Sequence, residues 1–383
     1  MDCNVCRTPL GDPIYDAGSD RALTSLCEFR TGRTRVWSCP HCGHLRGEAL
    51  DDTDRYYASD YRILLDQDDE DQIYEVHGER IVYRTDHQVS TLASKLALPE
   101  GALLLDYGCA KASTPQRLLA QRPDLQVHLF DVSAMYTAHW DRFVPPERRA
   151  MHLTPPHWEA RFDAITSFFA LEHIPDPGGT VEKVARLLKA DGIFYGVVPD
   201  TFGNVADFVV IDHVNHFTPS SLHVLLRGAG FESIDIDATA HRGALVFVAR
   251  KQGPRTPCPD VRDAVQRSLE LARYWSSLEA RIAEAERATG DAPAAVYGSG
   301  FYGAYIASTL RSTQPLRCFL DRSPFQQGKT LFGKPVLAPE QLPDDVRTLY
   351  VGLNPAIARA AMQPMGWLRS RGVQLVYLDG VPA

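Results

Sequence analysis

Between residues 91 and 250 the chain alternates short apolar runs with longer stretches whose apolar residues recur at helical spacing. A short apolar run bounded by turn residues is typical of a buried strand, and amphipathic spacing is typical of a helix that covers it. This alternation predicts an α/β fold in which helices wrap a parallel sheet. The runs expected to form strands are residues 103–105, 127–130, 164–166, 193–198 and 244–248.

Further regions flank this pattern. Residues 251–259 contain three prolines, which oppose regular structure, and are expected to be a linker. Near-helical spacing then predicts a helix from Val261 to about Ala288, and a second α/β pattern runs from Ala294 to the end. We therefore expect a module over residues 1–90, a doubly wound α/β domain over residues 91–250 and a Rossmann-like α/β domain over residues 254–383.

Length and charge narrow the class of protein. A chain of 383 residues is too long for one ordinary core. Its 40 basic and 48 acidic residues give a net charge of −8, which argues against a nucleic-acid partner, because such proteins usually present a basic face. No apolar run approaches the roughly 18 residues that span a bilayer, and the N-terminus lacks a signal-peptide pattern. We expect a cytoplasmic protein with neither a membrane nor a nucleic-acid partner.

Half of the eight cysteines form two C-x-x-C pairs near the N-terminus, and the others are scattered. Four thiolates suit the closed, tetrahedral coordination of structural Zn²⁺, and a C-x-x-C turn brings two of them to one ion. The alternative, a redox dithiol, normally uses one pair at a strand-to-helix junction. Metal ligands also fit a reducing compartment better than a disulfide framework does. The predicted zinc ligands are Cys3, Cys6, Cys39 and Cys42, with His41 and His44 as bystanders.

The first apolar run ends in an acidic residue and a turn of small residues. Asp106 closes the run, Gly108 lies in the turn, and Asp131 ends the next run. In a nucleoside-binding α/β fold the first turn lets the backbone approach the ligand, and an acid at the end of the second strand accepts ribose hydroxyls. A buried strand with an incidental loop is the alternative.

Downstream, residues 162–177 resemble the fourth-strand segment of class I S-adenosylmethionine-dependent methyltransferases, where "FDxI" precedes "LEHIPDP". Residues 187–194 are similar to the "LLKPGG" turn into their fifth strand. The resemblance implies a class I methyltransferase sheet, S-adenosylmethionine as cofactor and a fold-shaping role for His173. The candidate cofactor-binding residues are Asp106, Gly108, Cys109, Asp131, Phe168 and Phe169, with core packing as the alternative for the two phenylalanines.

A polar cluster precedes a predicted helix that Thr218 would cap and Pro219 would begin. The cluster contains Asp212, His213 and His216. A histidine that titrates near neutral pH suits a general base, and a neighbouring carboxylate can orient it. The alternative is a polar loop whose histidines bond only to the backbone.

The whole layout resembles the three-domain deoxysugar C-methyltransferases, which have a four-Cys zinc module, a central methyltransferase domain and a C-terminal Rossmann-like domain. In that family the second histidine of a His-Glu-His run is the proposed base. Alignment through Phe217 places this base on His213, with Asp212 as its acidic neighbour. The chain departs from the pattern because Val210 replaces a Tyr, Ile211 replaces the first His and Asp212 replaces the Glu.

The last region begins with a strand that enters a G-x-G-x-x-G turn, formed by Gly298, Gly300 and Gly303. Asp321 ends the following apolar run, so the pattern matches a dinucleotide fingerprint that presents a helix N-terminus to phosphates. An NAD-dependent oxidoreductase is one interpretation. In the resembled family this domain helps to hold a nucleotide-sugar, and residues 321–336 match its "D-x-x-P-x-x-Q-G" and "G-x-P-V" text. We favour support of the sugar diphosphate, or a fold retained without a ligand.

The resemblance implies that the acceptor is a nucleotide-linked 4-keto-6-deoxysugar and that His213 removes a proton beside its keto group, giving an enolate carbon that is methylated. The family's N-terminal module reaches its substrate near Tyr56, Tyr57 and Tyr61, and Tyr61 joins His213, Asp212 and His216 as a candidate catalytic residue. Methylation of an oxygen or nitrogen on a related sugar stays open. An NAD-dependent sugar oxidoreductase and a non-catalytic binding module also stay open.

Overall fold

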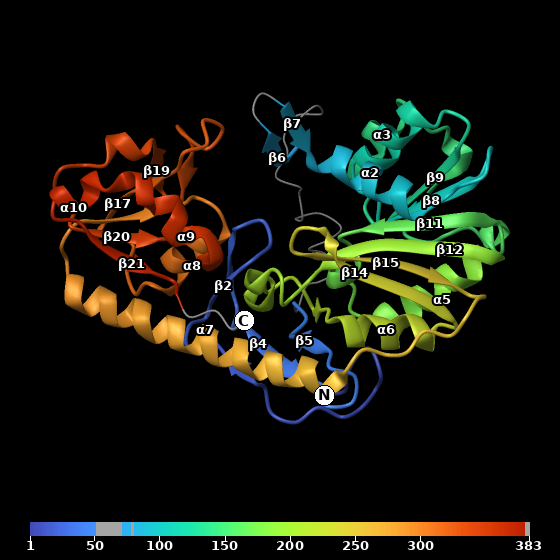
Figure 1. Ribbon diagram of the computed structural model, residues 1–383, viewed down its shortest axis with the longest axis horizontal. Coiled ribbons are helices and arrows are strands. Elements are labelled where there is room, and N and C mark those ends of the chain that lie inside the picture. The colour runs from blue at the N-terminus through green and yellow to red at the C-terminus, as the bar shows by residue number, and fades with distance from the viewer. Residues whose placement is uncertain (51–70, 78–79, 380–383) are drawn as a thin grey trace. The chain divides into compact units, whose positions relative to one another are not determined.

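The computed structural model describes residues 1–50, 71–77 and 80–379, which form two compact units (Figure 1). The first unit contains Met1–Gly11, Ser38–Asp207 and His213–Val265. The second contains Asp12–Trp37, Phe208–Asp212 and Gln266–Ala383. The N-terminal region therefore contributes residues to both units. The three boundaries expected from the sequence stay a prediction.

The core of the first unit is a seven-stranded sheet (Figure 1). In the order in which they pair, its strands are β10 (Arg149–Met151), β9 (Gln126–Asp131), β8 (Leu103–Tyr107), β11 (Phe162–Phe168), β12 (Leu188–Pro199), β15 (Ala244–Arg250) and β14 (Ser233–His241). The first five are parallel, in the order 3-2-1-4-5 of a doubly wound fold, and β15 is antiparallel to both of its neighbours. This confirms the predicted α/β sheet with a parallel core.

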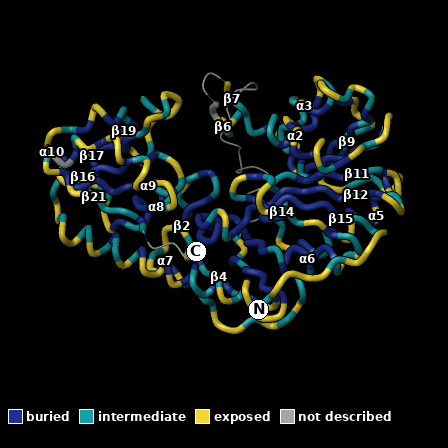
Figure 2. Tube along the Cα trace, in the orientation of Figure 1, coloured by how far each residue is buried: buried dark blue, intermediate teal, exposed yellow. Residues whose placement is uncertain are grey.

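Neighbouring residues of a strand point to opposite faces of this sheet, and helices cover both faces (Figure 1). On one face Leu104 packs with Val89 and Leu118, and on the other Leu105 packs with Val181. Figure 2 shows the central strands β8, β9 and β15 as mostly buried tube. The helices are α2 (Arg84–Lys95) and α3 (Ser113–Gln121) on the first face, and α5 (Pro177–Leu187) and α6 (Pro219–Gly228) on the second.

The start of α6 agrees with its predicted cap. The Thr218 side chain accepts the N–H of Ser221, and Pro219 occupies the first turn.

Two small antiparallel pairs also belong to this unit: β5 (Leu45–Gly47) with β13 (Asn215–His216), and β6 (Ile73–His77) with β7 (Arg80–Tyr83). Its remaining helices are α4 (Thr137–Trp140), η2 (Ala134–Tyr136), η3 (Pro146–Arg148), η4 (Pro156–Trp158) and η5 (Leu171–His173), while η6 (Val205–Val209) ends just beyond it.

The second unit contains a six-stranded sheet. Its strands pair in the order β18 (Thr330–Leu331), β19 (Lys334–Leu337), β17 (Leu316–Leu320), β16 (Ala294–Tyr297), β20 (Thr348–Val351) and β21 (Gln374–Tyr377). All neighbours except β18 and β19 are parallel, so the last five strands again follow a doubly wound order. Its shorter helices are α8 (Phe301–Thr309), η7 (Pro339–Gln341), α9 (Pro355–Met362), η8 (Gln363–Met365) and α10 (Trp367–Ser370).

Strands from the N-terminal region complete the second unit. β1 (Tyr15–Asp16) pairs with β4 (Arg35–Ser38), and β2 (Arg21–Leu23) pairs with β3 (Phe29–Thr31). The N–H of Ile211 donates to the carbonyl of Leu23, which ties residues 208–212 to the same segment. Such backbone bonds between distant parts of the chain explain why the N-terminal region is shared between the units.

The expected linker and the helix after it are confirmed. Residues 251–260 form no helix or strand, and α7 (Val261–Thr289) starts where the spacing of apolar residues predicted. Within the described part of the chain, no helix combines the length and the apolar character that crossing a membrane requires.

Candidate functional site

The turn after β8 is held tightly at the carboxyl end of the first sheet. The N–H groups of Gly108 and Cys109 donate to the carbonyl of Phe130, at 2.9 and 3.1 Å. Gly108 has a φ of +78°, and a Cβ atom there would lie 2.7 Å from the Cβ of Ala170. Ala110 also adopts a positive φ, of 45°, which costs an L-residue about 1 to 2 kcal/mol. The fold therefore holds this backbone in a strained conformation where a ligand would approach it.

Both predicted acids lie beside this turn. Asp106 is 3% exposed and accepts the hydroxyl of Thr166 at 2.7 Å, and burial raises its pKa to about 7. Asp131 accepts the N–H of Ala110 at 2.8 Å and the N–H of Ser133 at 2.9 Å, and burial raises its pKa as well. Asp131 thus lies at the end of the second strand, as predicted, and also fixes the turn.

The other predicted cofactor contacts differ in their surroundings. Cys109 is buried, which raises the pKa of its thiol, so only its backbone, and not a reactive thiolate, could contribute to a cofactor site. The ring of Phe168 packs against Tyr195 at a centroid distance of 5.8 Å, in agreement with the core-packing alternative. Phe169 has a φ of 52°, and the guanidinium of Arg84 lies 4.1 Å from the centre of its ring.

A variant Gly108→Ala should bind S-adenosylmethionine at least tenfold more weakly, because the added methyl meets Ala170 and the residue must keep a left-handed conformation. Gly101→Ala is the matched control, since Gly101 has a φ of +72° but no atom within 4 Å of the added methyl. Isothermal titration calorimetry measures both affinities. Unchanged affinity in Gly108→Ala, or an equal loss in both variants, would contradict the role given to this turn.

A buried carboxylate organises the histidine cluster in the first unit. Asp207 is fully buried. One of its oxygens lies 2.6 Å from Nδ1 of His213, and the other lies 2.9 Å from Nδ1 of His216. The hydroxyl of Thr201 donates to the second oxygen at 2.9 Å. Burial alone would raise the pKa of Asp207, but His216 and His213 together hold it well below its usual range.

This arrangement assigns different roles to the two histidines. Asp207 accepts the Nδ1–H of His213, so proton transfer to a substrate would use Nε2. A carboxylate held in this way fixes the orientation of the ring and stabilises the imidazolium that forms. His213 is 8% exposed, whereas His216 is 1% exposed and lies beside Gly47. The geometry therefore favours His213 as the base and His216 as a residue that holds Asp207.

The acid that pairs with His213 is not the one proposed from the sequence. The carboxylate of Asp212 accepts the N–H and the hydroxyl of Ser25, both at 2.7 Å, within the second unit. Asp207, which contacts His213, lies in η6 and was not a candidate. One signal could have identified it: Asp207 is an isolated acid in an otherwise apolar segment, and a buried acid needs a partner.

A second buried carboxyl group, that of Glu172, also lies near His213. Glu172 is 1% exposed, and its Oε2 has no hydrogen-bond partner among the residues that the structure describes. Potential ligand atoms of Glu172, His173 and His213 all lie within 4.8 Å of one another, and the two rings meet edge to face at 4.7 Å. Burial raises the pKa of Glu172 to about 8, so the group is mostly neutral at pH 7.

Stability should depend on pH through Glu172. Its folded pKa lies above its ordinary value of 4.5, so the folded protein retains a proton that the unfolded chain loses. This group therefore lowers the free energy of unfolding as pH rises from about 5 to about 8, by on the order of 1 kcal/mol per pH unit. Urea unfolding at both pH values should show a smaller loss of the free energy of unfolding in Glu172→Gln than in the wild type. Glu182→Gln, on the exposed surface of α5, should behave as the wild type, and an equal slope in all three proteins would contradict the assignment.

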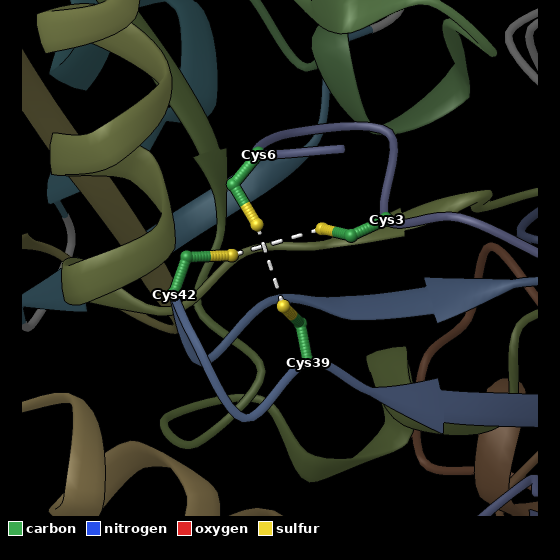
Figure 3. Close-up of side chains that lie close together, drawn as sticks. All are labelled: Cys3, Cys6, Cys39 and Cys42. Carbon is green, nitrogen blue, oxygen red and sulfur yellow. Dashed lines mark hydrogen bonds between the residues drawn. The ribbon is translucent and has the colours of Figure 1, made fainter. Parts of the chain in front are cut away.

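The four N-terminal cysteines converge in the first unit (Figure 3). Their sulfur atoms all lie within 4.8 Å of one another, with 3.7 Å between Cys3 and Cys42 and 3.4 Å between Cys6 and Cys39. In a tetrahedral zinc site with bonds of about 2.3 Å, the sulfurs are about 3.8 Å apart. The donor set therefore fits Zn²⁺. Without a cation, the neighbouring thiol of Cys39 and burial raise the pKa of Cys3.

Hydrogen bonds connect the cysteine turns to the histidine loop. The side-chain amide of Asn4, between the first two cysteines, donates to the side-chain oxygen of Asn215 at 2.5 Å. Asn215 in turn donates to the carbonyls of Leu171 and Ile174, at 2.8 and 2.7 Å. Because Asn215 lies two residues after His213, the cysteine module buttresses the segment that carries the candidate base.

In the second unit, close packing explains two of the three glycines of the predicted fingerprint. A Cβ atom on Gly298 would lie 2.3 Å from the carbonyl oxygen of Gly352, and one on Gly303 would lie 1.9 Å from that of Gly298. A Cβ atom on Gly300 would meet nothing within 4 Å. These contacts hold the turn against the end of β20. The predicted role of this turn in holding a sugar diphosphate stays a prediction.

Asp321, a predicted substrate-binding residue, already has protein donors. It accepts the N–H of Ser299 at 3.0 Å, the hydroxyl of Ser299 at 2.7 Å and the N–H of Ser323 at 2.9 Å. Asp321 thus fixes the glycine turn, as Asp131 fixes the turn after β8, and the NAD-binding alternative stays untested. The remaining candidate, Tyr61, lies outside the described residues together with Tyr56 and Tyr57.

Comparison with known proteins gives the class of the region that contains the strained turn. A family model described as a methyltransferase domain matches residues 79–236, which include the strained turn, both acids and the histidine cluster. The chain carries a methyltransferase domain. The predicted class of enzyme, an S-adenosylmethionine-dependent methyltransferase, is confirmed at the level of this domain.

Curated relatives match parts of this chain. The C-methyltransferase NovU of Streptomyces niveus is 29% identical over 205 residues, covering 47% of this chain and 48% of NovU. A ubiquinone biosynthesis O-methyltransferase of Xylella fastidiosa (strain M23) is 28% identical over 162 residues, covering 37% of this chain and 66% of that enzyme. The chain therefore spans about half the length of NovU and less than two thirds of the second relative.

Among solved structures, a Burkholderia thailandensis N1-methyltransferase with bound 1,6-didemethyltoxoflavin and S-adenosylhomocysteine is 25% identical. The aligned region covers 44% of this chain and 78% of that structure's chain, with a TM-score of 0.34. The class of the domain rests on the family match and the curated relatives.

Proposed function

We propose that the chain transfers the methyl group of S-adenosylmethionine to a carbon atom of a nucleotide-linked keto-sugar. The observation that carries the proposal is the pairing of His213 with the buried carboxylate of Asp207, because carbon must lose a proton before it can attack a methyl group. The match to a C-methyltransferase supports the carbon acceptor. The resemblance to deoxysugar methyltransferases supports the sugar.

The turn at Gly108 and the carboxylate of Asp131 are the residues that would hold the cofactor. Only a glycine fits beside Ala170 at this point, which keeps the backbone open to a ligand. Asp131 lies at the carboxyl end of the second strand, where an acid accepts ribose hydroxyls. Bound there, S-adenosylmethionine would supply an electrophilic methyl group on its positively charged sulfur.

The proton would leave the substrate at His213. Nε2 of His213 accepts a proton from the carbon next to the keto group, and the resulting imidazolium is stabilised by Asp207. The enolate carbon then forms a bond to the methyl group as the bond from that group to sulfur breaks. Alignment of the two reacting atoms by the protein supplies much of the acceleration.

The four cysteines would hold a structural Zn²⁺ ion. Cys3 and Cys42 are fully buried, and all four positions of a tetrahedral ion would be filled by sulfur. No ligand position would remain for a substrate. The ion would instead fix the turn that carries Asn4 and, through Asn215, the loop of His213.

A hydroxyl acceptor is the second candidate, because other curated relatives are O-methyltransferases. The same histidine would then remove a proton from oxygen. The two candidates differ in proton exchange, because only methylation of carbon requires removal of a carbon-bound proton of the substrate, which can then exchange with solvent.

Solvent deuterium exchange tests the carbon route. A nucleotide-linked keto-sugar incubated in D₂O with the protein and S-adenosylhomocysteine should gain deuterium beside its keto group, as seen by NMR. His213→Gln should abolish the exchange, while His157→Gln, at an exposed position, should not. Methyl transfer to a substrate that shows no exchange would contradict the enolate and favour a hydroxyl acceptor.

A further inference from the structure

We propose that a cavity in the second unit binds a small hydroxylated anion, such as a sugar acid or a sugar phosphate. The cavity has a volume of about 310 Å³, which lies within the usual range for small-molecule sites. Three parts of the unit surround it: the segment from Tyr15 to Thr34, the side of α7 and the last turn of α8.

The inner wall of the cavity is largely apolar but also contains hydroxyl groups. Leu23, Val209 and Leu310 are each buried and line the wall. Tyr305 is 6% exposed, and its hydroxyl oxygen is closed to solvent and interacts with the hydroxyls of Tyr15 and Thr309. A hydroxylated ligand that entered the cavity would add to this group of hydroxyls.

A second tyrosine, Tyr15, and the carboxylate of Glu279 make part of the cavity wall polar. The hydroxyl of Tyr15 donates to the carboxylate of Glu279, which also accepts the N–H of Gly18 at 3.1 Å. Glu279 is therefore already bonded within the protein. Hydroxyl groups of a ligand could share its remaining lone pairs, which is why the proposal specifies a hydroxylated molecule.

The exposed rim of the cavity carries positive charge. Arg21 and Arg311 both line it and are exposed. Arg21 donates to the carbonyl of Leu310 and lies 5.9 Å from the ring centre of Phe29, which fixes its side chain. Arg311 has no ion-pair partner in the described part of the chain. An exposed guanidinium group without an ion-pair partner can bind a carboxylate or phosphate through two hydrogen bonds.

The cavity is separate from the glycine turn of the same unit. α8 begins at Phe301, directly after that turn, whereas the cavity touches its other end, at Tyr305, Ser308 and Thr309. A nine-residue helix is about 13 Å long. A ligand in the cavity therefore does not depend on phosphate binding at the turn, nor on methyl transfer in the first unit.

Titration calorimetry on the full chain tests the proposal, with glucuronate and glucose 6-phosphate as probes and glucose as the uncharged control. At least one anionic probe should bind with one-to-one stoichiometry and more tightly than glucose. Tyr305→Phe and Arg311→Gln should each weaken binding at least tenfold. Arg262→Gln is the matched control, because that side chain is 94% exposed and lies outside the cavity.

A cavity-filling variant adds an independent check. Ala283 lies on α7 in the cavity wall and is only half-buried, so Ala283→Phe should keep the melting temperature while abolishing binding. Absence of binding by both anions overturns the proposal. If only Arg311→Gln weakens binding, the anion binds at the surface, which contradicts binding inside the cavity. If only Tyr305→Phe weakens binding, the ligand does not need a negative charge, which contradicts the proposal of an anion.

Discussion

Replacing Asp207 with asparagine should lower the rate of methyl transfer by roughly 10² to 10⁴-fold while the affinity for S-adenosylmethionine changes by less than about twofold. The amide cannot stabilise an imidazolium, and its NH₂ group can reverse the direction of the bond to Nδ1 of His213. The ring would then carry its proton on Nε2, the nitrogen that must accept the substrate proton. Binding of the cofactor does not involve this carboxylate.

Asp212→Asn is the matched control for this experiment. Sequence reasoning named Asp212 as the acidic neighbour of the base, whereas the structure places its carboxylate on Ser25. We therefore expect the control to retain turnover within about tenfold. Single-turnover kinetics with labelled cofactor would separate chemistry from binding, and melting curves would report folding. A larger loss in Asp212→Asn than in Asp207→Asn would contradict the pairing described above.

Replacing Cys39 with serine should reduce bound zinc from one ion per chain to near zero and destabilise the first unit by several kcal/mol. Cys39 is buried and lies 3.4 Å from Cys6, so its loss leaves three thiolates and a poor oxygen donor. Turnover should fall as well, because the cysteine turn positions Asn4 against the histidine loop.

Cys258→Ser provides the comparison, since Cys258 is exposed and lies outside the four-sulfur cluster. Elemental analysis of both purified variants would give the metal content, and urea unfolding would give the stability. The wild type and Cys258→Ser should each contain one zinc ion. A wild type free of zinc, or Cys39→Ser with its full complement, would contradict the metal centre.

Local sequence pattern was enough to predict the elements of the first sheet that lie in its centre. Each apolar run became part of a strand, because a strand buried on both faces needs apolar residues at every position. The edge strand β14 (Ser233–His241) was not predicted. Its apolar residues alternate with two acids and one threonine, and an edge strand with one solvated face has no continuous apolar run.

The candidate sites show the same difference: residues marked by a local sequence pattern were predicted, and residues that depend on tertiary contacts were not. Cys3 and Cys39 could be assigned to one predicted metal site from the sequence, because the type and spacing of metal ligands can be read directly from it. Asp207 could not be assigned to His213, because the contact depends on how η6 folds back on the loop after it. The involvement of residues 12–37 in the second unit also depends on tertiary contacts, such as that between Ile211 and Leu23.

Mass spectrometry of nucleotide-sugars incubated with the protein and methyl-labelled S-adenosylmethionine tests the central claim most directly. The panel should contain keto-sugars and their non-keto counterparts, and fragmentation should locate the added methyl group. The proposed function predicts label on a ring carbon next to the keto group, and loss of that label in His213→Gln. Label on an oxygen or nitrogen atom would contradict carbon methylation, and transfer to no member of the panel would contradict the sugar acceptor.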